Sequence, residues 1–119
     1  MADIPIKLPD GELEVMQAVW DCTPPVSRAE IEHLLCQRHP LAATTILTLL
    51  SRLTQRGALK VEKQGRNNLY TPVFSRQDYL AAQGKRFFRQ LCGGDLHTFA
   101  SALCDSGLTG EEIEELREL

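Results

Sequence analysis

The stretch from Thr44 to Tyr70 constrains the fold most, because a helix-like pattern changes there to a strand-like one. Apolar residues recur at helical spacing until Gly57, and the positions on this apolar face are Ile46, Leu49, Leu50 and Leu53. Gly57 is a natural left-handed end for a helix. After it, Leu59 and Val61 alternate with polar residues, as in a half-buried strand. The sequence therefore predicts a helix over about residues 42–56, followed directly by a strand.

The residues after this strand predict a β-hairpin. Six consecutive residues rich in turn formers, Lys63 to Asn68, precede a second short strand over Leu69 to Val73, where Pro72 ends the pairing. Lys63 and Arg66 are expected to project from the tip of the hairpin.

Two further helices are predicted before this stretch. The first runs from about Asp10 to Trp20, and the prolines at 24 and 25 separate it from the next. Ser27 caps the second helix, and Glu30 follows three residues later, as in a capping box. The apolar faces of the two helices are Leu13, Met16, Val19 and Trp20, then Ile31, Leu34 and Leu35. Three helices and a basic hairpin predict a mainly α winged helix-turn-helix over residues 1–74.

Charge is unevenly distributed along the chain, whose net charge is -3. Residues 1–36 and residues 105–119 each carry a net charge of -5, whereas residues 37–66 carry +5. The cations of this basic stretch are Arg38, Arg52, Arg56, Lys60, Lys63 and Arg66. Such a stretch is expected of a phosphate-binding face, although the charge count alone is equally compatible with a solvated face.

The polar face of the third helix favours the interpretation that this basic stretch binds nucleic acid. It presents short hydroxyl side chains and arginines without any glutamate, a composition suited to the major groove of DNA. A helix that faces only water usually mixes both charge signs. We therefore predict duplex DNA as the partner, and the predicted contact residues are Ala43, Thr44, Thr45, Thr48, Arg52, Arg56, Lys63, Arg66 and Asn67.

Residues 75–119 form a predicted helical dimerisation segment of three short helices. Ser75 and Asp78 cap a helix over about residues 76–92, and Thr109 and Glu112 cap a final acidic helix. One glycine pair, Gly93-Gly94, and one Ser-Gly step, Ser106-Gly107, separate the three. Alone they bury little apolar surface, so they pack either on the winged domain or on a second copy. A homodimer is favoured because DNA readers of this size usually pair. Its predicted interface residues are Tyr79, Phe87, Phe88, Leu91, Phe99 and Leu103.

Other classes of protein have little support in the sequence. No run approaches the roughly 20 apolar residues of a membrane span, and the start lacks a signal-peptide layout, so a cytoplasmic protein is expected. No nucleophile–base pair or phosphate loop appears, so neither an enzyme nor a cofactor, metal or small-molecule substrate is predicted. A winged helix that binds only proteins is the main alternative. The unpaired cysteines are expected to be small, buried and reduced: Cys22, Cys36, Cys92 and Cys104.

The sequence resembles the penicillinase and methicillin-resistance repressors over nearly its whole length. The matching motifs are L-E-V-M-x-x-V-W at 13–20, T-I-x-T-L-L-x-R-L-x-x-x-G-A-L at 45–59, K-x-G-R-x-x-x-Y-x-P at 63–72 and I-E-E-L-R at 113–117. The resemblance implies a dimeric transcriptional repressor with an amino-terminal operator-binding domain and carboxy-terminal dimer helices. By position, Thr45, Thr48 and Arg52 match the recognition helix of the family, and Arg66 matches its wing.

Two features of family members are missing here. Members that respond to β-lactams carry an Asn-Phe cleavage bond before the last helix, where this chain reads F-A-S-A-L at 99–103. Copper-responsive members carry paired C-x-C motifs near the carboxy terminus, where this chain has only Cys104. The resemblance therefore implies neither of these two induction routes.

Overall fold

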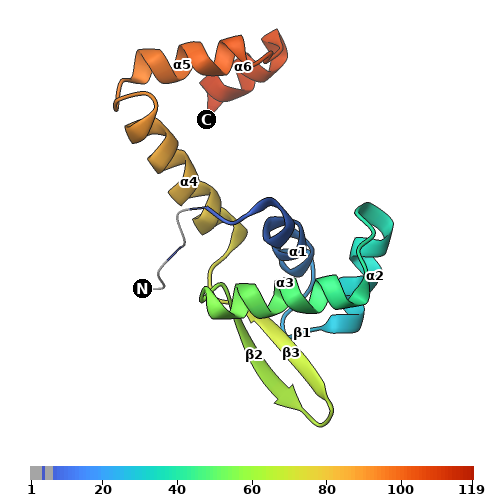
Figure 1. Ribbon diagram of the computed structural model, residues 1–119. Helices are drawn as coiled ribbons and strands as arrows, with labels where there is room; N and C mark the ends of the chain where they lie inside the picture. The colour runs from blue at the N-terminus through green and yellow to red at the C-terminus, as the bar shows by residue number, and fades with distance from the viewer. Residues whose placement is uncertain (1–3, 5–6) are drawn as a thin grey trace. The chain divides into compact units, whose positions relative to one another are not determined.

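The computed structural model describes residue 4 and residues 7–119, which fall into two compact units divided between Ala82 and Gln83. The first unit holds α1 (Asp10–Trp20), β1 (Val26–Ser27), α2 (Arg28–Arg38), α3 (Ala43–Gln55), β2 (Leu59–Gln64) and β3 (Asn67–Pro72) (Figure 1). Helix α4 (Arg76–Gln90) begins in the first unit and ends in the second, which continues with α5 (Leu96–Asp105) and α6 (Gly110–Glu118). The predicted winged helix-turn-helix is confirmed.

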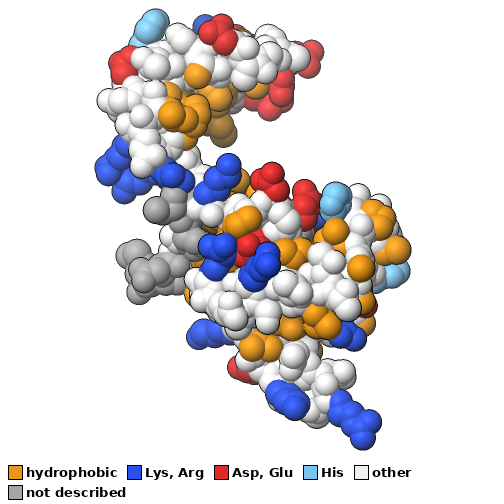
Figure 2. All heavy atoms as spheres, viewed as in Figure 1, with side chains coloured by type: hydrophobic (Ala, Val, Ile, Leu, Met, Phe, Trp, Pro, Cys, Tyr) orange, Lys and Arg blue, Asp and Glu red, His pale blue; other side chains and the backbone are white. Residues whose placement is uncertain are grey.

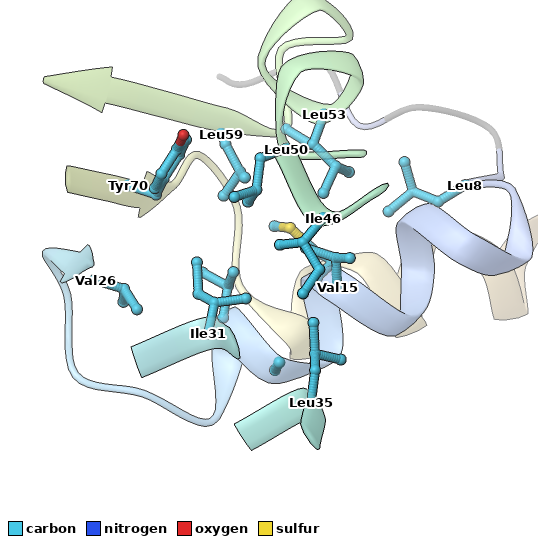
Figure 3. Packing of buried hydrophobic residues seen from close by; sticks show 14 of the residues in the cluster. Leu8, Val15, Val26, Ile31, Leu35, Ile46, Leu50, Leu53, Leu59 and Tyr70 are labelled. Carbon is cyan, nitrogen blue, oxygen red and sulfur yellow. The ribbon is translucent and has the colours of Figure 1, made fainter. Parts of the chain in front are cut away.

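The three amino-terminal helices and the bases of the strands enclose one apolar core (Figure 3). Each helix contributes the face that its periodicity predicts, although four of the predicted residues are only partly buried: Leu13, Trp20, Leu34 and Leu49. Burying such a side chain stabilises the fold by about 1.5–3 kcal/mol. The core fixes α3 with its opposite face outward. The helical side chains that carry it are Val15, Met16, Val19, Ile31, Leu35, Ile46, Leu50 and Leu53.

The sheet has a strand that the sequence did not predict. Strand β1 pairs antiparallel with β3, with Val26 opposite Tyr70 and Ser27 opposite Leu69, so the strand order is β1-β3-β2. Two residues are too few to show an alternating pattern. This short strand ties the start of α2 to the base of the wing.

The wing is longer and its turn tighter than predicted. Strands β2 and β3 pair from Leu59 opposite Pro72 to Gln64 opposite Asn67, so only Gly65 and Arg66 form the turn. The prediction of a six-residue turn was wrong, because Gly65 at φ 64° lets the chain reverse in two residues. Val61 is 42% exposed rather than half-buried, since the hairpin extends away from the helices (Figure 1).

Most predicted helix caps are present. Thr109 forms a full capping box with Glu112, and the Ser75 hydroxyl accepts a hydrogen bond from the Asp78 amide at 3.0 Å. The Ser27 hydroxyl accepts from the Glu30 amide at 3.2 Å, but the Glu30 carboxylate accepts from that hydroxyl instead of from the backbone. These caps set where α2, α4 and α6 begin.

The second unit buries little of its apolar surface. Phe87 and Phe88 pack edge-on against Phe99 with ring centroids 5.9 and 5.6 Å apart. Cys92 is the one buried residue of this unit among those described, and Leu91 is 73% exposed. Among the described residues, no helix is both long and apolar enough to cross a membrane.

Candidate nucleic-acid interface

Helix α3 turns a polar face to solvent. Ala43, Thr44, Thr45, Thr48 and Arg52 are all exposed, so Thr45, Thr48 and Arg52 do lie on the side of the helix opposite the core. The Thr48 hydroxyl donates to the Thr44 carbonyl oxygen at 3.0 Å, which fixes its proton and leaves its oxygen free to accept from an outside donor. A shallow hollow of about 280 Å³ follows this face, and its lining is Thr44, Thr45, Thr48, Leu49 and Arg52.

One apolar side chain on this face was not predicted. Leu47 lies on α3 between the exposed threonines and is 38% exposed, although a leucine at this position could have been assigned to the core. An exposed leucine on a recognition helix offers an apolar contact of the kind that thymine methyl groups accept. Only its offset from the stripe at 46, 50 and 53 distinguishes it in the sequence.

A second hollow brings α3 and the wing together with the start of α2. It measures about 290 Å³, and it places Arg66 and Asn67 of the wing near Leu47 of α3 and Arg28 of α2. Figure 2 shows Lys and Arg side chains at the tip of the hairpin. Sequence reasoning missed the α2 residues and Asn68, because the approach of α2 to the wing depends on β1. The full lining is Ser27, Arg28, Ala29, Leu47, Arg66, Asn67, Asn68 and Tyr70.

Arg56 lies in a different setting from the other predicted contacts. Its Nε donates to Glu12 Oε1 at 2.6 Å, and Glu12 is only 2% exposed at the start of α1. A buried carboxylate needs such a partner, because an unpaired charge in the interior is costly. Arg56 therefore anchors the end of α3 to α1 instead of pointing a free guanidinium outward.

The basic stretch accordingly divides into paired and unpaired cations. Arg38 pairs with Asp21 and Arg56 with Glu12, so two of the six charges are met within the chain. The side chains of the other four make no ion pair or hydrogen bond with any residue that the structure describes, and all four lie on α3 or the wing: Arg52, Lys60, Lys63 and Arg66.

The predicted dimer residues separate into two groups. Tyr79 is buried in the first unit, where its hydroxyl accepts from the Leu8 amide at 2.9 Å and its ring stacks on Phe74 at 6.0 Å. It serves that core and has little surface left for a partner. The others lie in the second unit, where Phe87, Phe88 and Phe99 pack together and Leu91 is exposed. Leu103 lines an apolar hollow of about 220 Å³ with Ala100, Cys104, Leu108, Ile113, Leu116 and Arg117.

The cysteines are free thiols in two kinds of surroundings. Cys92 is buried and Cys22 is partly buried, and burial, followed by Glu30 and Asp21, raises the pKa of the Cys22 thiol. Cys36 and Cys104 are exposed, so the prediction of burial was wrong for these two. No group of three or more His, Cys, Asp or Glu side chains in the described part of the chain is arranged to hold a metal ion.

Comparisons with known proteins agree with this arrangement. The family model described as "Penicillinase repressor" matches residues 8–119. The penicillinase repressor of Bacillus licheniformis is 33% identical over an alignment that spans all of this chain and 92% of the relative.

Two solved structures are similar to the amino-terminal part. The DNA-binding domain of the repressor BlaI has a TM-score of 0.56 and 37% identity, and covers 66% of this chain and 94% of that domain. A monomeric form of Bacillus licheniformis BlaI, solved in complex with the blaP half-operator, has a TM-score of 0.54, 37% identity and the same coverage. This chain therefore belongs to the penicillinase repressor family of winged-helix transcriptional regulators.

Proposed function

We propose that this protein is a cytoplasmic homodimeric repressor that binds a two-half-site operator through α3 and the wing of each copy. The observation that carries this proposal is the outward face of α3, where Thr45, Thr48 and the unpaired Arg52 form an acid-free surface. The adjoining wing adds three more unpaired cations, Lys60, Lys63 and Arg66.

In this proposal, α3 lies in the major groove. Thr45 and Thr48 are small enough to bring the helix axis close to base edges, and the Thr48 hydroxyl, whose proton is held by the Thr44 carbonyl, accepts a hydrogen bond from a base amino group. Arg52 reaches guanine or the flanking phosphate from the next turn. Leu47 faces the same groove and contributes apolar contact.

The hollow between the wing and α2 suits the DNA backbone. Arg28 of α2 and Arg66 of the wing both line it, and Asn67 and Asn68 offer amide donors. Such contacts set the register of the protein on the duplex without reading its sequence. Arg28 also pairs with Glu32 at 3.3 Å, but the Glu32 side chain is 32% exposed, whereas the Glu12 partner of Arg56 is buried. Arg28 is therefore an added phosphate contact in the proposal, and Arg56 is removed from the contact set because it holds Glu12.

The second unit supplies the dimer contact. Its apolar side chains are only partly covered within one chain, and a second copy would remove Phe87, Leu91, Leu103 and Leu116 from water.

The direct test is a gel-shift titration of the full chain against genomic fragments over a series of salt concentrations. Specific binding should appear and should weaken steeply with salt.

Arg52→Ala should cost about 1–3 kcal/mol of operator affinity, and Thr48→Ala combined with it should cost more. Lys85→Ala removes one exposed cation from α4, outside the proposed contact residues, and is the matched control, with little expected loss. Unchanged affinity in the double variant would reject the assignment of α3. Absence of DNA binding at every salt concentration would favour the alternative of a protein-binding winged helix.

A further inference from the structure

Arg76, the first residue of α4, is held by α1 on several sides. Its Nε donates to Gln17 Oε1 at 3.0 Å, and one terminal nitrogen donates to the Gln17 carbonyl oxygen at 3.1 Å and to Asp21 Oδ1 at 2.8 Å. The guanidinium also lies over the Trp20 ring, 5.6 Å from its centroid. A planar guanidinium can satisfy these directions at once, whereas a lysine ammonium cannot. We call this set of contacts the α4 clamp.

Two neighbouring contacts hold the same short segment. The Trp20 indole nitrogen donates to the Phe74 carbonyl oxygen at 3.0 Å, and the Tyr79 hydroxyl accepts from the Leu8 amide at 2.9 Å. Three residues thus attach the start of α4 to α1 and to Leu8, which precedes α1: Phe74, Arg76 and Tyr79. The segment between the wing and α4 is therefore fixed to the winged domain and does not act as a free linker.

Asp21 extends the clamp to a third helix. Its carboxylate accepts from Arg76 of α4 and, at 2.5 Å, from Arg38 at the end of α2. Hydrogen bonds from Arg38 and then Arg76 lower the pKa of the Asp21 carboxyl, so the charge that joins the helices persists at neutral pH. One side chain thereby joins the ends of α1 and α2 to the beginning of α4.

Helix α4 is also the element that passes from the first unit into the second. The clamp holds the first turn of α4 to α1. We propose that Arg76 is a positioning residue that fixes the direction in which α4 leaves the winged domain, and so determines which half-site spacing the dimer accepts. The proposal rests on the proposed function, since it concerns how two DNA-binding units are held for one operator.

The physical argument is one of effective concentration. When the geometry lets both DNA-binding units contact the duplex, linkage raises the overall affinity of a dimer about 100-fold or more above that of one unit. When the geometry prevents this, the gain is lost. A rigid connection concentrates that gain at one spacing, whereas a loose connection spreads it over several. Loosening the clamp should therefore change the spacing preference while leaving each half-site contact as it was.

The experiment measures the affinity of the full chain for one half-site and for duplexes whose two half-sites are separated by the native distance or by one to four added base pairs. The wild type should bind the native spacing best. Arg76→Gln and Arg76→Lys should reduce the ratio between best and worst spacing by about tenfold, within the range that linkage provides. Single half-site affinity should change less than about twofold, because Arg76 is absent from the α3 and wing surface.

Lys85→Gln is the matched control, since it removes one exposed cation from α4 without touching Asp21 or the clamp. It should keep the spacing profile of the wild type. The proposal is overturned if both Arg76 variants keep that profile, if they lose half-site affinity equally, or if both fail to fold, as judged by the helical signal in far-ultraviolet circular dichroism. If the wild type binds no duplex at all, the proposed function fails instead, so the two failures are distinguishable.

Discussion

At the scale of single residues, the cations near the proposed DNA surface differ in whether the chain already pairs them. Arg38 pairs with Asp21 and Arg56 pairs with Glu12, so the charge of each arginine is partly neutralised within the chain. Arg52 and Arg66 make no such pair in the part of the chain that the structure describes. Side chains of the second kind can release counterions from DNA without first breaking an internal contact.

Arg66 gives a prediction of this kind. Arg66→Ala should weaken binding to all duplex sequences about equally and should reduce the slope of log affinity against log salt by about one ion, because a phosphate contact carries no sequence information. Fluorescence anisotropy with an operator and a scrambled duplex measures both effects. A loss confined to the operator would identify Arg66 as a base-reading residue and contradict the prediction.

Helical periodicity predicts only part of the site. The face carrying Thr45, Thr48 and Arg52 follows from the apolar stripe opposite it, so the sequence predicted it correctly. Arg56, four residues after Arg52, is also an arginine, but it caps the end of α3, and its direction depends on Glu12, 44 residues away in the chain. A buried acid in an otherwise apolar helix face is visible only once the helices are packed.

At the scale of elements, most helices could be predicted because caps and stripes are local signals. Ser27, Ser75 and Thr109 each accept from the expected amide. Strand β1 and the extra length of the wing could not be predicted, because they arise from backbone pairing between distant segments and not from side-chain alternation. The hollow that joins the wing to α2 was missed for the same reason.

The junction of α1, α2 and α4 should make stability depend on pH. The lowered pKa of Asp21 means that its stabilising contribution is fully present above its ordinary value of 3.8 and is lost as pH falls through the lower folded value. Asp21→Asn should therefore be less stable than the wild type at pH 7, and the difference in unfolding free energy should shrink below pH 3.8.

Urea unfolding of both proteins over this pH range provides the measurement. Asp105→Asn, which removes an exposed carboxylate from the end of α5, is the control and should show little difference at any pH. A difference between Asp21→Asn and the wild type that stayed constant down to the lowest pH would show that the charge of Asp21 does not stabilise the junction.

At the scale of the whole molecule, the border between the two units differs from the change in sequence character. Composition changes near residues 74–75, but the compact units divide after Ala82, because Arg76 and Tyr79 belong to the first unit.

A fragment ending at 82 should fold as a monomer, whereas one ending at 74 should be less stable because it lacks the Tyr79 ring and the clamp. Thermal unfolding and light scattering of the two fragments test this. Equal stability of both fragments would mean that the start of α4 adds nothing to the first unit.

In the proposed function, two copies of this chain, joined through their carboxy-terminal units, occupy one operator. Sedimentation of the full chain at micromolar concentration, alone and with a duplex carrying two half-sites, tests it most directly. The account predicts a free dimer of two 13.3-kDa chains that adds to the duplex in a single step, whereas the fragment ending at residue 82 adds one copy at a time and far more weakly. A full-length chain that sediments as a monomer and binds in two independent steps, or that binds no duplex, would contradict it.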